Sequence, residues 1–258
     1  FAARSVTAGF VVAALMAAQG AFACTVDNWS DTFGNLTAGS PADGVERFSG
    51  LCAVQTPSGE VSYVQDENPG GIGRIIARFY VLADNTEDAV IYRGFDSSGN
   101  ELFNVSLAAD GQVTLSSDGV SAGPVSGVSG NWNSIEIDWN AADGLVLTVN
   151  NEQPASVDFS ASSMVDFVRL GNLERPGNLG GAAGTLNFDS YESRRSTAVG
   201  RLLLADASND GQITGGDLSV IAGEILGTAL ASGQPDCTED GSVTGADLSC
   251  TAAIILGL

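Results

Sequence analysis

An acidic segment occurs twice near the end of the chain, and this repeat restricts the fold more than any other feature. Residues 206–218 read DASNDGQITGGDL, and thirty residues later 236–248 read DCTEDGSVTGADL. Each acidic segment is followed by a stretch with apolar residues at helical spacing, DLSVIAGEILG and DLSCTAAIILG. A short helix with one apolar stripe must bury it, so we expect the two copies to pack together.

Each acidic segment has oxygen donors at the spacing of a calcium-binding loop. Ca²⁺ takes oxygen ligands from loop positions 1, 3, 5, 7, 9 and 12, with Gly at position 6. The predicted ligands of the first loop are Asp206, Ser208, Asp210, the carbonyl of Gln212, Thr214 and Asp217. Those of the second loop are Asp236, Thr238, Asp240, the carbonyl of Ser242, Thr244 and Asp247. The alternative, a pair of acidic turns without an ion, would leave converging carboxylates to repel one another. We therefore expect one Ca²⁺ in each loop.

The repeat resembles the dockerin modules of cellulosome-type enzymes. The resemblance rests on Asp at loop position 12, the Asp-Leu pair ending each loop, and the near-tandem duplication of an EF-hand-type loop. It implies a module that calcium folds and a helix face that binds a cohesin partner. The positions that often contact cohesin in that family are Gly215-Gly216 and Gly245-Ala246 here, which offer no side-chain hydrogen bonds. A calcium-stabilised C-terminal cap is the alternative role.

The longer part of the chain is predicted to be an antiparallel β-sandwich. Runs such as RIIARFYVLA, SIEIDWN and LVLTVNN are rich in β-branched and aromatic residues, and pairs such as Asp110-Gly111 separate them. Residues 131–152 and 167–195 resemble strands of the concanavalin A-like jelly-roll family of lectin, laminin G-like and glucanase domains. We expect a mainly β protein, with this domain over 24–195, a connector over 196–205 and the helical calcium-loop module over 206–258.

Catalysis has few candidate residues in this sequence. There is no His, which excludes Ser-His and Cys-His nucleophilic sites and His-ligated zinc. Glu136 and Asp138 match two of three alternating acidic positions in laminarinase-type members of the jelly-roll family. The third position is Asn140, and an amide cannot act as a general acid. The alternative is that these side chains form the solvated face of a strand, with Ile135, Ile137 and Trp139 in the core.

The N-terminal residues and the cysteines predict export. Residues 1–23 have the order of a secretory signal peptide, ending in Ala21-Phe22-Ala23 before Cys24. Four cysteines in an exported chain favour disulfides, and their segregation predicts the pairs Cys24–Cys52 and Cys237–Cys250. The alternatives are a lipid anchor on Cys24 and free thiols in the second repeat. We expect a secreted or cell-surface bacterial protein without an integral membrane span.

Charge and aromatic content restrict the function. Thirty-one acidic residues against ten arginines give a net charge of −21, which excludes nucleic acid as a partner. Aromatic residues that could stack on sugars or pack in the core are Trp29, Trp132, Tyr63, Tyr80, Tyr92 and Tyr191. Our first hypothesis is a non-catalytic protein that recognises a polysaccharide or surface glycan or mediates adhesion, with a tail for attachment or stabilisation. The alternatives are a glycoside hydrolase using Glu136 and Asp138, and a structural subunit of an extracellular assembly.

Overall fold

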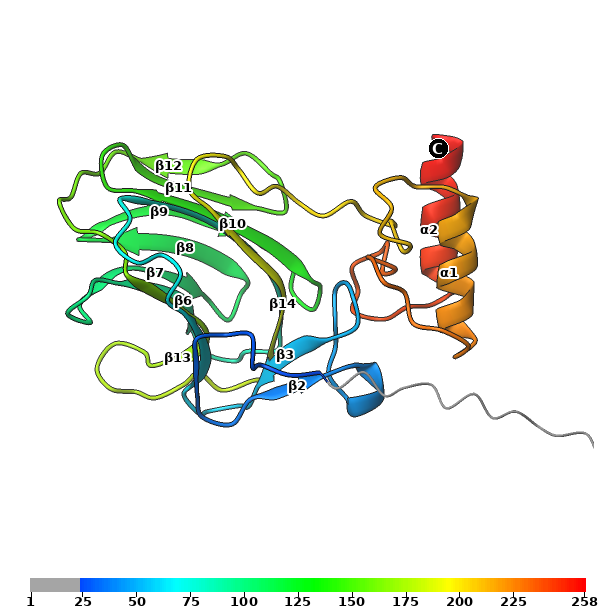
Figure 1. Ribbon diagram of the computed structural model, residues 1–258, viewed down its shortest axis with the longest axis horizontal. Coiled ribbons are helices and arrows are strands. Elements are labelled where there is room, and N and C mark those ends of the chain that lie inside the picture. The colour runs from blue at the N-terminus through cyan, green and yellow to red at the C-terminus, as the bar shows by residue number, and fades with distance from the viewer. Residues whose placement is uncertain (1–23) are drawn as a thin grey trace, which may run out of the picture.

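The computed structural model describes residues 24–258, and the predicted signal peptide lies outside this range. The chain forms two antiparallel seven-stranded sheets followed by two C-terminal helices that lie beside one end of the sheets (Figure 1). The predicted mainly β sandwich with a small helical region after it is therefore confirmed.

Strands distant in sequence alternate within each sheet. The first, here the β6 sheet, has the order β1 (Asp31–Phe33), β4 (Ser62–Asp66), β13 (Phe167–Leu173), β6 (Ala89–Phe95), β7 (Glu101–Leu107), β8 (Gln112–Ser117) and β9 (Val120–Ser126). The second, here the β10 sheet, has the order β12 (Ala155–Val157), β11 (Gly144–Val149), β10 (Asn133–Asn140), β5 (Arg74–Ala83), β14 (Leu186–Arg194), β3 (Ala53–Thr56) and β2 (Thr37–Gly39). A single 3-10 turn, η1 (Pro41–Asp43), follows β2.

The main hydrophobic core lies between the two sheets. Ile135, Ile137 and Trp139 of β10 are fully buried in it, whereas Glu136 and Asp138 alternate with them on the outer face. Each such side chain contributes about 1.5–3 kcal/mol when it leaves water. The period-2 pattern of the sequence thus places the two candidate catalytic carboxylates outside the core.

A smaller aromatic cluster lies on the outer face of the β10 sheet. Phe48, Tyr80 and Trp132 are buried together, with Leu82 and Leu202 packed against them. The rings of Phe48 and Tyr80 stack with their centroids 3.7 Å apart. Since Leu202 comes from the connector, the C-terminal part of the chain covers this portion of the sheet.

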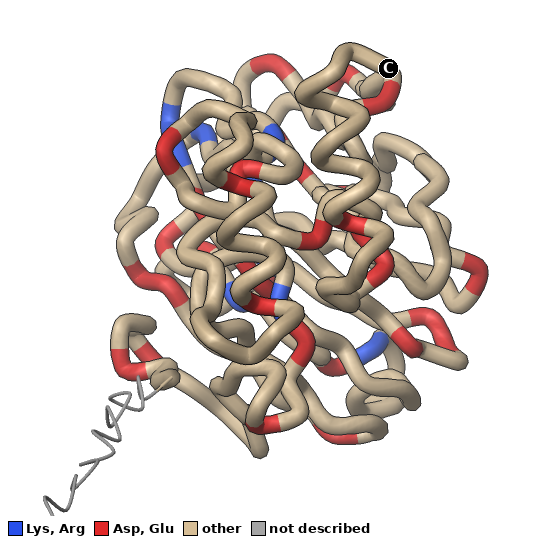
Figure 2. Tube along the Cα trace, turned by 90° about the vertical axis from the view of Figure 1, so that its right-hand side faces the viewer, with Lys and Arg blue, Asp and Glu red and all other residues tan. Residues whose placement is uncertain are grey.

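The two helices begin inside the acidic repeats. Helix α1 spans Gly215–Ile225 and α2 spans Gly245–Leu256, and they pack against each other as the repeat predicted. Thr214 and Thr244 are the N-caps, and Asp217 and Asp247 complete a capping box in each helix. Neither helix is long and apolar enough to cross a membrane. Acidic residues are spread over this end of the molecule with few arginines between them (Figure 2).

Both predicted disulfides are present. Cys24 is bonded to Cys52 and Cys237 to Cys250, with Cα–Cα distances of 5.6 and 5.9 Å, and no cysteine within residues 24–258 is free. The sulfur of Cys24 is therefore unavailable to a lipid anchor, and the free-thiol alternative for the second repeat is wrong. Structural disulfides are typical of proteins in oxidising compartments.

A buried carboxylate attaches the loop that carries Phe48. Asp189 Oδ2 accepts the backbone N–H groups of Phe48 and Ser49 at 2.7 and 2.8 Å, and Oδ1 accepts that of Ser190 at 2.5 Å. Burial raises the pKa of Asp189 from 3.8 to about 6, against the lowering effect of these hydrogen bonds.

Replacing Asp189 with Asn should lower the free energy of unfolding by about 1–3 kcal/mol at neutral pH, because an amide NH₂ would then face backbone N–H groups. The folded-state pKa lies above the ordinary value, so the stability that protonation of this carboxyl adds is fully present below about pH 3.8 and is lost as the pH rises through about 6, in addition to the pH-independent part from its hydrogen bonds. The loss on substitution should therefore be larger near pH 4 than near pH 7. Urea unfolding of both proteins across this range measures it, and an equal loss at every pH would contradict the assignment.

Candidate functional site

In the first acidic loop the backbone folds around its first carboxylate. Asp206 Oδ1 accepts the N–H of Asp210 at 3.0 Å, and Oδ2 accepts that of Gly211 at 2.8 Å. Asp210 Oδ1 in turn accepts the N–H of Gln212 at 2.9 Å. Gly211 has a φ of 81°, a left-handed conformation that suits glycine at the sharp turn.

The second loop repeats these contacts one by one. Asp236 accepts the N–H groups of Asp240 and Gly241 at 3.2 and 2.8 Å, and Asp240 accepts that of Ser242 at 2.9 Å. Gly241 has a φ of 87°. The same sequence pattern therefore produces the same local structure twice.

The carboxylate at loop position 12 closes each loop. Asp217 and Asp247 are fully buried. Their Oδ1 atoms accept the N–H of Ser208 and Thr238, both at 2.9 Å, and their Oδ2 atoms accept the N–H of Thr214 and Thr244 at 2.8 and 2.7 Å. Each buried carboxylate thus joins positions 3, 9 and 12, which are three of the six predicted ligand positions.

Electrostatics connect the acidic residues of the second loop. Burial raises the pKa of Asp236 to about 7, against the lowering effect of the Gly241 N–H, and the charges of Asp247 and Asp240 raise it further. The three carboxylates are therefore close enough to interact.

Within residues 24–258 no three Asp, Glu or Cys side chains alone form a group that could hold a metal ion. A loop of this type also uses hydroxyl and backbone carbonyl oxygens, which Ser208, Gln212 and their counterparts provide. The donors are all hard oxygens, which fits Ca²⁺ and not a softer metal.

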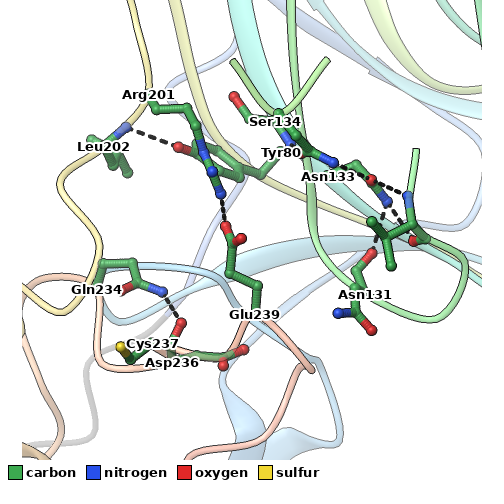
Figure 3. A network of polar contacts seen from close by, with 12 residues as sticks. Tyr80, Asn131, Asn133, Ser134, Arg201, Leu202, Gln234, Asp236, Cys237 and Glu239 are labelled. Atoms are coloured by element: carbon green, nitrogen blue, oxygen red, sulfur yellow. Dashed lines mark hydrogen bonds and ion pairs between the residues drawn. The ribbon is translucent and has the colours of Figure 1, made fainter. Parts of the chain in front are cut away.

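The two loops differ in their surroundings, because the second contacts the sandwich and the connector, and Figure 3 shows its Glu239 directed toward Arg201. The backbone N–H of Trp132 donates to the carbonyl of Glu239 at 2.9 Å, and the Glu239 carboxylate pairs with Arg201. A Cβ on Gly241 would lie 3.1 Å from Leu82 Cδ2. At the equivalent positions of the first loop, Asn209 is exposed and a Cβ on Gly211 would have no neighbour within 4 Å.

A buried ion pair fixes the first helix to the sandwich. Arg47, in the loop after η1, pairs with Glu224 of α1, and their side chains are 2% and 8% exposed. Beside this pair the N–H of Gly50 donates to the carbonyl of Gly233 at 2.9 Å. The C-terminal tail, residues 206–258, is therefore attached to the rest of the chain at two places, through α1 and through the second loop.

The connector crosses the outer face of the β10 sheet and reaches the candidate catalytic residues. Glu136 Oε2 accepts the N–H of Gly200 at 2.6 Å. Asp138 forms a two-point ion pair with Arg74, at 2.9 and 2.6 Å. Both carboxylates are thus engaged: Glu136 holds the connector, and Asp138 pairs with Arg74 of the neighbouring strand β5.

Half of the candidate sugar-stacking aromatics are inaccessible, because Trp132, Tyr80 and Tyr92 are buried. The half-buried Trp29 and Tyr191 pack on each other with ring centroids 5.0 Å apart and line a pocket of about 220 Å³. Tyr63 alone lies on the open outer face of a sheet.

Sequence reasoning missed the neighbours of Tyr63 on the outer face of the β6 sheet. This group, here the aromatic–arginine face, consists of Phe33, Tyr63, Gln65, Phe95, Phe167 and Arg169. Its signal in the sequence was the alternation of residues 63 and 65 and of residues 167 and 169, which places each pair on one side of a strand.

No protein-family model matches the chain, and no curated protein matches it in sequence. Among solved structures, a sialidase matches 69% of this chain and 18% of its own length, with 13% identity and a TM-score of 0.42. The present chain thus spans about a fifth of that protein. A cellulose-induced protein, Cip1, matches 67% of this chain and 91% of its own, with 12% identity and a TM-score of 0.47. The alginate lyase AlyC3 matches 55% and 74%, with 8% identity and a TM-score of 0.42. These values assign no ligand or activity to the present chain.

Replacing Glu239 with Gln should loosen the second loop from the sandwich, because Arg201 loses its charged partner. We expect the free energy of unfolding to fall by about 1–2 kcal/mol. Hydrogen exchange at the Trp132 amide, which donates to Glu239, should become faster. Asn209→Ala, at the equivalent exposed position of the first loop, is the matched control and should leave this amide unchanged. Unaltered exchange in the Glu239 variant would show that the ion pair does not fix the loop.

Proposed function

We propose that this is a secreted, calcium-binding, non-catalytic protein that recognises a polysaccharide or surface glycan, with a calcium-stabilised C-terminal cap. The observation that carries the calcium proposal is the repeated loop geometry, in which the first Asp accepts the N–H groups of positions 5 and 6 and the last Asp is buried. The two disulfides support secretion, because such bonds persist in oxidising compartments.

The residues that would hold the ions are those predicted at loop positions 1, 3, 5, 7, 9 and 12. When bound, Ca²⁺ would supply positive charge to two groups of converging carboxylates. In a chain of net charge −21 this removes repulsion where acidic side chains are packed most closely. Bound calcium should therefore favour the folded tail over the unfolded tail.

The tail is better suited to a cap than to a cohesin-binding module. Arg47–Glu224 attaches it to the sandwich and Arg201–Glu239 attaches it to the connector, so it is packed on its own chain. Residues 215, 216, 245 and 246 are exposed, but Gly-Gly and Gly-Ala offer no side-chain hydrogen bonds to a partner.

Recognition without catalysis is supported by the two sheet faces. On the outer face of the β10 sheet, the candidate carboxylates Glu136 and Asp138 are bound to Gly200 and Arg74. The outer face of the β6 sheet carries aromatic rings, an arginine, and the amide and hydroxyl groups of residues such as Asn104, Ser106 and Ser116. Aromatic rings with hydrogen-bonding groups around them are suited to sugar rings, which have apolar C–H faces and polar edges.

Calorimetric titration of the whole protein with Ca²⁺ should show two sites. Asp210→Ala should remove or weaken one site and Asp240→Ala the other, because each substitution deletes the carboxylate at loop position 5. Calcium should also raise the Tm of the wild-type protein, and a chelator should reverse the rise. Two unaltered sites in either variant would refute the ligand assignment.

A glycan array probed with the calcium-loaded protein tests the recognition proposal. We expect binding to one class of polysaccharide and no turnover of any bound glycan. Glu136→Gln should retain the wild-type binding profile. The absence of a signal on all neutral and acidic glycans would refute recognition, and turnover that the Glu136 variant abolishes would instead favour a hydrolase.

A further inference from the structure

The aromatic–arginine face brings together four strands that are far apart in the sequence. Phe33 of β1 is opposite Tyr63 of β4, Gln65 is opposite Arg169 of β13, and Phe167 is opposite Phe95 of β6. The rings of Phe33 and Tyr63 are stacked at 5.4 Å, and those of Phe95 and Phe167 at 4.9 Å. Two stacked pairs therefore flank Arg169 along one side of the sheet.

The guanidinium of Arg169 is held in place by these rings. Its Cζ lies 4.5 Å from the ring centre of Tyr63, 4.8 Å from that of Phe95 and 5.3 Å from that of Phe167. Its Nε donates to Gln65 Oε1 at 2.8 Å. Cation–π contacts of this kind fix the plane of the group without neutralising its charge.

Arg169 also differs from other arginines in its lack of an acidic partner. Seven arginines of residues 24–258 form ion pairs with Asp or Glu: Arg47, Arg74, Arg78, Arg93, Arg175, Arg194 and Arg201. Arg169 forms none, although the chain carries 31 acidic residues. Gln65, which accepts from Arg169, donates its amide N–H to Glu67 Oε1 at 2.9 Å. The terminal nitrogens of a rigid cation are thus left for an external anion.

We propose that the aromatic–arginine face binds a polysaccharide whose sugars carry carboxylate groups, with Arg169 as the specificity-determining residue. This inference rests on the proposed function and names its ligand class. The planar guanidinium fork matches a carboxylate, and charge-assisted hydrogen bonds of this type are about twice as strong as neutral ones. Phe33 is 54% exposed, so its ring offers an apolar surface to the C–H face of a neighbouring sugar.

The strong negative charge of the protein does not oppose this contact at physiological ionic strength. Charges beyond about 8 Å are largely screened there. The interaction is then decided by the charges beside the face, where Arg169 attracts the anion and Asp31 and Glu67, next to Gln65, oppose it. The same negative charge would repel a polyanion at low salt. A carboxylated glycan should therefore bind more weakly as the ionic strength falls well below that value.

Calorimetry with the full calcium-loaded protein tests the proposal, using a short oligogalacturonate and its methyl ester. The acid should bind, and the ester should bind about 10- to 100-fold more weakly because it offers no charge to Arg169. Arg169→Gln should weaken binding of the acid by a similar factor and leave the ester unchanged. Arg169→Lys should recover part of the loss, since it keeps the charge but not the fork.

Two further variants separate the site from a general effect on folding. Phe33→Ala removes an exposed ring and should weaken binding of both probes by the same factor. Arg195→Gln is the matched control, because Arg195 also lacks an acidic partner but follows β14 in the other sheet, and it should bind the acid like the wild type.

Equal binding of acid and ester, or wild-type binding of the acid by Arg169→Gln, would overturn this inference and leave glycan recognition standing. If the wild type binds no glycan, acidic or neutral, both proposals fail. If Arg169→Gln does not fold, the comparison of acid with ester and the Phe33 variant still decide.

Discussion

Carboxylates that accept backbone N–H groups hold the parts of this molecule that the main hydrophobic core does not reach. The tail has a core of only Ala207, Ile221 and Ala231, with a few partly buried side chains around it. Its backbone is instead organised by the first and last Asp of each loop, and Asp189 does the same for the loop that carries Phe48. Such bonds are directional, so they determine loop shape in a way that a small apolar core cannot. They also concentrate negative charge, which is the reason for the proposal that Ca²⁺ binds in the two loops.

The elements that could be predicted depend on local patterns. Alternation placed Ile135, Ile137 and Trp139 in the core and Glu136 and Asp138 outside it, and the repeat placed both helices. Segregation of the cysteines gave both disulfides. These features needed only neighbouring residues, because strand and helix periods are local properties.

The features that could not be predicted depend on strand order and on docking. Arg169 meets Tyr63 because β13 lies beside β4, although about a hundred residues separate them. Arg47 and Glu224 are even further apart in sequence. Nothing local in the chain indicates which strands become neighbours, so the aromatic–arginine face and the attachment of the tail remained hidden. The spacing of the repeats indicated that the two loops share one backbone structure, and their calcium ligands stay a prediction. The spacing did not indicate the different surroundings of the two loops.

The path of the connector has a mechanical consequence. Between the end of β14 and the tail, Ala198 accepts a hydrogen bond from Arg194, Gly200 donates to Glu136 of β10, and Leu202 donates to Tyr80 of β5. A pull on the C-terminus would therefore be shared among three adjacent strands instead of peeling the last strand from the sheet. Because these contacts lie along the outer face, they would have to break together, in shear, before the load reached β14. If the protein is anchored at its C-terminus while it holds a polymer, the force would reach the sandwich through the connector and its contacts with three strands, and not through β14 alone.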